Sequence, residues 1–401
     1  MPGFPRFRRA VFCILSAVLA AAGCDDKAPS DVDHSLPSVE ITFPSDGAIV
    51  SGVGLYVEVN ATDDGEFSEI DRVEMLVNNT DFSIDDTPPF SLFVPTIAEL
   101  EGAVFDIVVR AFDEVGNFSE DAVTVTSNVR TVFPLTSDPG DDMNPTWEPD
   151  GQRIAFQSDR SGEQFDIYVM EADGTNESAL TTNLNDDRNP AWSPLQQHIA
   201  FDSNRAGDDD IWRILVVSGE ASVEPLTFGN LDDLEPTWSP DGTAIAFSSS
   251  RGTGNEFNIW RIPGTGGTAV QLTAFPETDE TPAYSPSGNI LAFVSTLNFA
   301  TRHVYLKYFP DDSVVPLTGN VGYEELDPAW SPQDRAVAFA RNSGAGAHSN
   351  IWILVLGRVI AAQGTFGTGV VGDAGPAWSP DGTTLAFHSD RSGNLDIYVV
   401  K

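Results

Sequence analysis

Six acidic residues recur at one position of an internal repeat, and their spacing makes them the best candidates in this chain for binding a cation. Each lies three residues before a proline, and four of them follow a second acid. Carboxylates on equivalent loops of a closed ring would crowd one mouth of its central channel and create a focused negative field. The six residues are Asp142, Asp187, Asp233, Asp279, Glu325 and Asp373.

Three interpretations of these carboxylates stay open at the level of sequence. Each side chain could cap its own turn by accepting hydrogen bonds from backbone N–H groups. Alternatively, the six could form a ring that holds a cation or a basic partner, or their recurrence could be chance. If the ring holds a metal, oxygen ligands favour calcium or magnesium over zinc.

Other catalytic and cofactor signatures do not occur in the sequence. There is no Gly-x-Ser-x-Gly elbow, P-loop or dinucleotide fingerprint. The histidines are scattered without a metal-binding spacing, so we predict no catalytic or cofactor-binding residue. They are His34, His198, His303, His348 and His388.

The acidic positions belong to six near copies of one strand–turn–strand unit, of which residues 236–247 (PTWSPDGTAIAF) are the clearest. Asp-Gly is a good tight-turn pair, and Ile-Ala-Phe suits a buried strand. The aromatic residue recurs every 45 to 48 positions, a period typical of one blade of a β-propeller. The aromatic residues are Trp147, Trp192, Trp238, Tyr284, Trp330 and Trp378.

The last repeat ends after its third strand, at Lys401. The segment Val132–Thr136 precedes the first repeat and carries the Leu-Thr pair that ends most fourth strands. We therefore expect this early segment to complete the last blade and close the ring, which removes open sheet edges.

The repeats resemble the TolB-like, WD-like β-propeller repeats, whose core reads P-x-W-S-P-D-G-x-x-I-A-F-x-S-x-R. The resemblance covers residues 131–401 and implies a six-bladed all-β propeller. Peptidases with similar propellers add a hydrolase domain, which is not seen here, and the N-terminal α/β domain of TolB itself is absent. The Ser-x-Arg part is kept in four repeats, at Ser158–Arg160, Ser203–Arg205, Ser249–Arg251 and Ser389–Arg391.

Residues 1–23 read as a targeting segment, with three arginines before a short apolar stretch. The sequence Ala21-Ala22-Gly23-Cys24 resembles a bacterial lipoprotein signal, which implies that Cys24 becomes the lipidated first residue. The alternative is an ordinary secretory signal that is cut nearby. Residues 24–37 are polar and rich in Asp, Ser and Pro, as expected of a flexible tether.

Residues 38–128 carry short alternating strands without the Trp-Ser-Pro signature, a pattern typical of a β-sandwich. They resemble bacterial Ig-like modules at Pro37–Ile41, Val73–Asn78 and Ala111–Asn117. In that family such modules serve mostly as spacers or adhesive units.

The chain carries 21 Lys and Arg against 60 Asp and Glu, and loss of the segment's three arginines makes the mature net charge −42. This charge argues against binding nucleic acid. It favours solubility or attraction of cations and basic partners.

The leading hypothesis is a monomeric, non-enzymatic lipoprotein of the cell envelope. It would be anchored to the membrane by lipid and would bind an envelope protein or peptide through the propeller face. The alternative is a metal-dependent enzyme that acts on sugars or peptides at the channel mouth.

Overall fold

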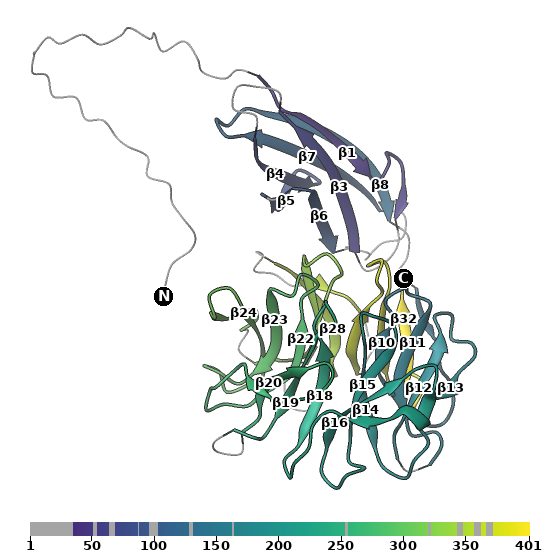
Figure 1. Ribbon diagram of the computed structural model, residues 1–401. Coiled ribbons are helices and arrows are strands. Elements are labelled where there is room, and N and C mark those ends of the chain that lie inside the picture. The colour runs from purple at the N-terminus through teal and green to yellow at the C-terminus, as the bar shows by residue number, and fades with distance from the viewer. Residues whose placement is uncertain are drawn as a thin grey trace, which may run out of the picture.

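The computed structural model describes residues 35–401 except for 51–53, 64–68, 87, 96–102, 128–130, 163, 253–255, 320–321, 343–347, 357–361 and 366–371. The expected signal segment, Cys24 and most of the tether lie outside the described residues. Within the described residues there is no α-helix, one 3-10 helix, η1 (Gly219–Ser222), and otherwise only strands. None of these elements is a helix that could span a membrane. The chain forms two β domains (Figure 1).

The first domain is a two-sheet sandwich, as expected for an Ig-like module. Its sheets have the strand orders β1-β3-β6 and β2-β8-β7-β4-β5, and they enclose a core of alternating apolar residues such as Val57, Val73 and Val109. The strands are β1 (Ser38–Phe43), β2 (Ile49–Val50), β3 (Gly54–Thr62), β4 (Ile70–Val77), β5 (Thr80–Asp85), β6 (Phe90–Pro95), β7 (Val104–Asp113) and β8 (Phe118–Ser127).

The second domain is a propeller whose described residues form six four-stranded sheets, here numbered as blades one to six. The innermost strands are β10 (Asp142–Trp147), β14 (Asp187–Trp192), β18 (Asp233–Trp238), β22 (Asp279–Tyr284), β26 (Glu324–Trp330) and β30 (Asp373–Trp378). The second strands are β11 (Arg153–Ser158), β15 (His198–Ser203), β19 (Ala244–Ser249), β23 (Ile290–Ser295), β27 (Ala336–Asn342) and β31 (Leu385–Ser389). The third strands are β12 (Asp166–Glu171), β16 (Asp210–Leu215), β20 (Asn258–Pro263), β24 (His303–Tyr308), β28 (Asn350–Val355) and β32 (Asp396–Val400). The outer strands are β13 (Ser178–Ala179), β17 (Glu224–Pro225), β21 (Val270–Gln271), β25 (Val314–Pro316), β29 (Ala362–Gln363) and β9 (Val132–Pro134).

The repeated apolar residues explain how neighbouring blades pack. The Ile-Ala-Phe strands are fully buried because sheets cover both of their faces. In three blades the repeated tryptophan also donates a hydrogen bond to the preceding blade; the Trp238 Nε1 donates to the carbonyl oxygen of Ala191 at 3.1 Å. Trp330 does the same to Ala283, also at 3.1 Å.

The expected closure of the ring is confirmed. Strand β9 pairs antiparallel with β32, with Phe133 opposite Val399. The following Thr136 is buried, and its Oγ1 accepts a hydrogen bond from the Ile397 N–H at 2.9 Å and donates to Asp396 at 3.3 Å. The two ends of the propeller are therefore joined within one sheet.

The sandwich packs against the propeller on the face that carries the Asp-Gly turns. Phe93 is buried there, with its ring centroid 6.0 Å from that of Trp378 in an edge-to-face arrangement. Tyr56 covers the Gly382 turn, and Asp85 pairs with Arg335 at 2.5 Å. The opposite face of the propeller points away from the sandwich.

Removal of the Thr136 hydroxyl should destabilise the propeller as much as the same change inside an ordinary blade. Thr136→Val leaves the Ile397 N–H without its hydrogen-bond acceptor, which lowers the free energy of unfolding by about 1–3 kcal/mol. Thr181, whose Oγ1 accepts from Ile167 N–H at 2.9 Å and donates to Asp166 at 3.2 Å, provides the matched variant Thr181→Val. Urea unfolding compares the two, and a neutral Thr136→Val beside a costly Thr181→Val would mean that the ring does not close here.

Candidate functional site

The structure corrects the expectation that the six acidic residues form an open ring of like charges. All six carboxylates are fully buried at the inner edge of their blades, and five of them are paired with an arginine from the same blade. A buried carboxylate needs such a partner because desolvation strongly penalises the charged form. Neither turn capping nor a shared ring describes these residues.

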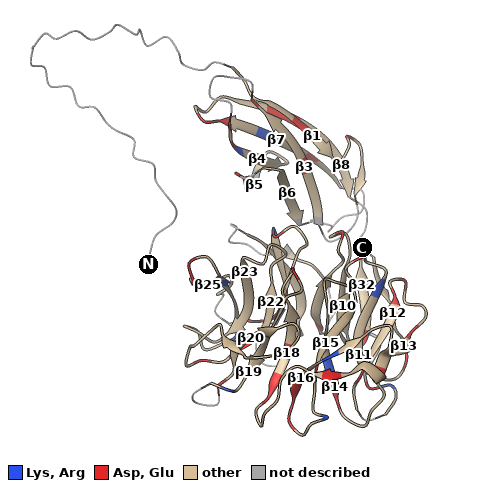
Figure 2. Cartoon of the chain, in the orientation of Figure 1, with Lys and Arg blue, Asp and Glu red and all other residues tan. Residues whose placement is uncertain are grey.

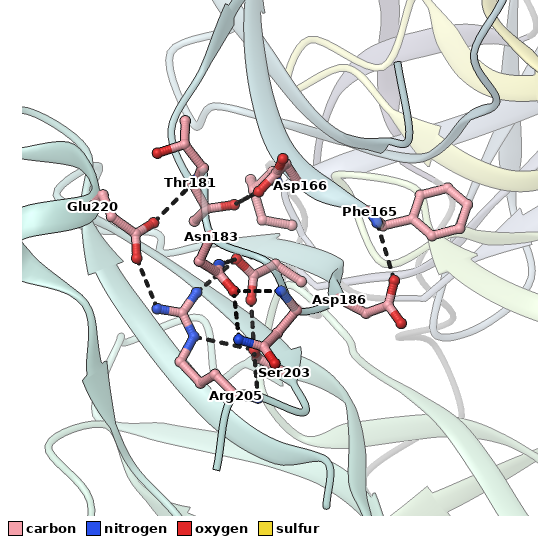
Figure 3. A network of polar contacts seen from close by, with 12 residues as sticks. Phe165, Asp166, Thr181, Asn183, Asp186, Ser203, Arg205 and Glu220 are labelled. Atoms are coloured by element: carbon pink, nitrogen blue, oxygen red, sulfur yellow. Dashed lines mark hydrogen bonds and ion pairs between the residues drawn. The ribbon is translucent and has the colours of Figure 1, made fainter. Parts of the chain in front are cut away.

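Blade two shows the pairing in full (Figure 3). The Arg205 guanidinium donates to Asp187 Oδ2 at 2.6 Å and to Ser203 Oγ at 3.1 Å, while its Nη1 lies 3.0 Å from Glu220. Ser203 Oγ donates to the other oxygen of Asp187 at 2.5 Å. The guanidinium also stacks over Trp212, 5.2 Å from the ring centroid. The arginine and serine of the Ser-x-Arg segment therefore bind the acidic residue of their own blade, and the arginine neutralises its charge.

Blades four and five depart from this arrangement. In blade five, Glu325 pairs with Arg341 at 2.8 Å and with His303 Nδ1 of the neighbouring blade at 2.7 Å. In blade four, Leu297 stands where the arginine would be, and no basic side chain of the described residues pairs with Asp279, whose polar neighbours are the hydroxyls of Ser295 and Thr273.

The acids that precede two of the six bind backbone N–H groups of the preceding blade. Asp186 Oδ1 accepts from the Phe165 N–H at 3.0 Å, and Asp141 Oδ1 accepts from the Leu395 N–H at 2.9 Å. In the described part of the chain, no group of three or more His, Cys, Asp or Glu side chains could hold a metal ion. The geometry therefore gives no support to calcium or magnesium bound by all six carboxylates.

The central channel is lined two positions further along each innermost strand, by residues that the sequence analysis did not single out. They enclose a cavity of about 220 Å³ together with the prolines that follow them. All six adopt positive φ, between 48° and 58°, at a register shift of the strand. These residues are Asn144, Asn189, Glu235, Thr281, Asp327 and Gly375.

Hydrogen bonds across the channel wall join one blade to the next. The Asn189 N–H donates to Gln157 at 2.8 Å, the Glu235 N–H to Asp202 at 2.9 Å, and the Thr281 N–H to Glu235 at 2.7 Å. The Gly375 N–H likewise donates to Asp327 at 3.2 Å. In each case a side chain of the preceding blade satisfies a backbone donor that the register shift has released from the sheet.

Burial changes the acidity of these groups. It raises the pKa of Asp202 to about 8 and that of Glu235 to about 7, and it also raises the pKa of Asp327. Burial lowers the pKa of His388 to about 4. The Nδ1 of this histidine accepts a hydrogen bond from the Asn144 N–H at 3.3 Å. Near neutral pH the channel wall therefore carries less charge than its composition suggests, and it can act as a polar hydrogen-bonding surface.

The sequence matches the family model described as the TolB beta propeller domain over residues 134–308 and 281–401. The chain belongs to the TolB β-propeller family. Residues 37–131 match the model of the bacterial Ig domain, so the Ig-like assignment is also confirmed. No curated protein matches the chain.

Solved structures match the chain at low sequence identity. TolB from Acinetobacter baumannii is 16% identical with a TM-score of 0.48, covering 91% of this chain and 79% of that one. A putative TolB from Agrobacterium tumefaciens is 20% identical with a TM-score of 0.42, covering 82% and 97%. Oligogalacturonate lyase from Vibrio parahaemolyticus is 11% identical with a TM-score of 0.46, covering 75% and 98%.

Stability of the TolB-type propeller should fall as pH rises, and Asp202 should account for part of the change. Its pKa is higher in the folded than in the unfolded chain, so between about pH 4 and pH 8 folding binds a proton, and stability is lost with rising pH. Asp202→Asn keeps an acceptor for the Glu235 N–H but cannot ionise. Its advantage over wild type should grow by about 1–4 kcal/mol from pH 5 to pH 8 in urea unfolding. Parallel pH profiles for the two proteins would contradict this assignment.

Proposed function

We propose that this protein is a non-enzymatic, lipid-anchored scaffold of the cell envelope that binds a basic protein or peptide on the propeller face turned away from the Ig-like domain. We name this the distal face and define it by the loops that join outer to innermost strands and second to third strands. The proposal is supported chiefly by the domain arrangement, since the sandwich covers part of the opposite face through Phe93, Tyr56 and Asp85.

The orientation of the sandwich fits a spacer. Strand β3 begins beside the propeller at Gly54 and ends at Thr62, which pairs with Ser38 at the start of β1. The chain therefore enters the sandwich at the end far from the propeller (Figure 1). Nine residues of strand span about 30 Å. A lipid on Cys24 would hold the protein at the membrane and leave the distal face outward.

The distal loops of blades two and three combine negative charge with exposed apolar side chains. Figure 2 shows acidic segments near β14, β16 and β18. Burial raises the pKa of Asp209, and the charges of Asp232 and Asp186 raise it further. Among these acids, Leu184 is 88% exposed and Phe228 is 75% exposed. Apolar contacts surrounded by acids suit a basic protein or peptide better than a sugar.

The experiment that tests this function places a photo-crosslinking amino acid at Leu184 in the full-length protein, in the cells that produce it. The matched control places it at Leu195, which is 62% exposed on the turn between β14 and β15 of the same blade, at the opposite face. We expect a discrete protein adduct from position 184 that weakens with added salt and is missing from position 195. Equal adducts from both positions, or none from position 184, would contradict the proposed face.

The anchor is tested in the same cells by Cys24→Ser. This variant should move from the membrane pellet to the soluble fraction, because the described residues contain no membrane-spanning helix. A variant that stays in the pellet would contradict lipid attachment at this residue.

A further inference from the structure

Blades one, two, three and six each build the same small cradle for a guanidinium group. Its anionic end is the buried aspartate, its floor is a pair of aromatic rings, and the arginine comes from the turn after the second strand. In blade one the cradle consists of Asp142, Phe156 and Tyr168, with Arg160 lying 5.3 Å and 4.8 Å from the two ring centroids. Blade six repeats it with Arg391, 2.5 Å from Asp373.

Blade four keeps the cradle but not the arginine. Its floor is Phe293 and Tyr305, with ring centroids 5.9 Å apart and planes at 30°. Under Arg160 the corresponding rings are 5.8 Å apart, also at 30°, so the two floors match. The anionic end is Asp279, which is fully buried. The residue at the arginine position is Leu297, which packs against the aromatic floor but carries no charge.

Three polar side chains of this cradle have no basic partner in the described part of the chain. They are Asp279, whose carboxylate has only the hydroxyls of Ser295 and Thr273 as polar neighbours, Tyr305 and Glu277. Burial raises the pKa of Tyr305, the Asn298 side chain opposes this shift by hydrogen bonding to the hydroxyl, and the nearby charges of Asp279 and Glu277 raise it. A buried carboxylate without a charged partner is costly, and here two of the three groups are acids.

We propose that the blade-four cradle binds an arginine side chain of the partner protein. This assignment rests on the proposed binding function and names the chemistry of one contact on the distal face. A guanidinium would pair with Asp279 and Glu277 through charged hydrogen bonds and stack on Phe293 and Tyr305. Arginine fits better than lysine because its planar head both forks onto a carboxylate and stacks on a ring.

Entry of the ligand requires movement of the side chains that cover Asp279. Leu297 and Phe299 are both only partly buried and lie in the surface turn after β23, with Asn298 and Ala300 exposed beside them. Phe299 rests against His303, with ring centroids 4.5 Å apart. Displacement of two partly exposed side chains opens the cradle without disturbing the sheet.

A direct test is to place an arginine at position 297 of the chain itself. The Leu297 N–H donates to Ser295 Oγ at 3.0 Å, as the Arg251 N–H donates to Ser249 Oγ at 3.2 Å, so both residues start from the same backbone position. Leu297→Arg should fill the cradle and raise Tm by about 3–10 °C, since it pairs a buried lone carboxylate. Leu297→Met is the matched uncharged control and should not raise it.

Binding is measured on the full-length protein at pH 8 with N-acetyl-arginine amide, and with the N-acetyl amides of citrulline and lysine as comparison probes. We expect the arginine probe to bind wild type and Leu297→Met, the lysine probe to bind at least fivefold more weakly and the citrulline probe not to bind. Leu297→Arg and Asp279→Asn should each abolish arginine binding. Arginine binding that survives Leu297→Arg, or is absent from wild type, would overturn the cradle.

The same variants separate this inference from the function on which it rests. If the probe binds as expected but position 184 gives no protein adduct, the cradle stands and the proposed partner-binding function fails. If the adduct forms equally in wild type and Leu297→Arg, and the probe does not bind, the function stands and the cradle is wrong.

Discussion

The propeller depends on a buried ion pair that is rebuilt in nearly every blade. A carboxylate at the start of the innermost strand loses its water on folding, and the arginine beyond the second strand replaces that water with directed hydrogen bonds. Because the arginine also stacks on the aromatic floor, one side chain joins the first strand, the second strand and the turn to the third. Five of the mature chain's scarce basic residues are used in this way, at Arg160, Arg205, Arg251, Arg341 and Arg391.

This internal neutralisation changes how the overall charge is understood. The repeated acids are not the source of a surface field, since they are buried and most are paired. The field comes from acids outside the pairs, such as Asp208, Asp209 and Asp232, in the loops of the distal face. Blade four is the exception inside the propeller. It lacks the arginine, and its buried carboxylate is therefore available to pair with a guanidinium from another protein. The same chemical logic therefore explains a stable blade and a candidate binding contact.

Much of the fold could be predicted from the sequence because the repeat fixes it. The period of the tryptophan places each innermost strand, and the stray Leu135-Thr136 pair identifies the strand that closes the ring. The pairing of Asp187 with Arg205 was also within reach, since an acid and an arginine recur eighteen residues apart in blades one, two, three and six. Neither motif indicates the pair by itself, because the acid begins the innermost strand and the arginine follows the second strand.

The channel lining was harder to predict. Its six positions hold Asn, Glu, Thr, Asp and Gly, and they share a backbone conformation rather than a side-chain type. Asn, Asp and Gly tolerate positive φ, but Glu235 and Thr281 do so only because the neighbouring blade holds their N–H groups. Such a constraint arises from tertiary packing and leaves a weak trace in the sequence, namely the proline that always follows.

The most direct test of the central ion pair is a double-mutant cycle in blade two, using Asp187→Asn, Arg205→Met and the combined variant in urea unfolding at pH 7. Each single change should cost about 3–5 kcal/mol, because it leaves a buried group without its partner. The double variant should cost at least about 1 kcal/mol less than the sum of the two single changes. Additive effects, or single changes that cost almost nothing, would show that the blades do not depend on this pair.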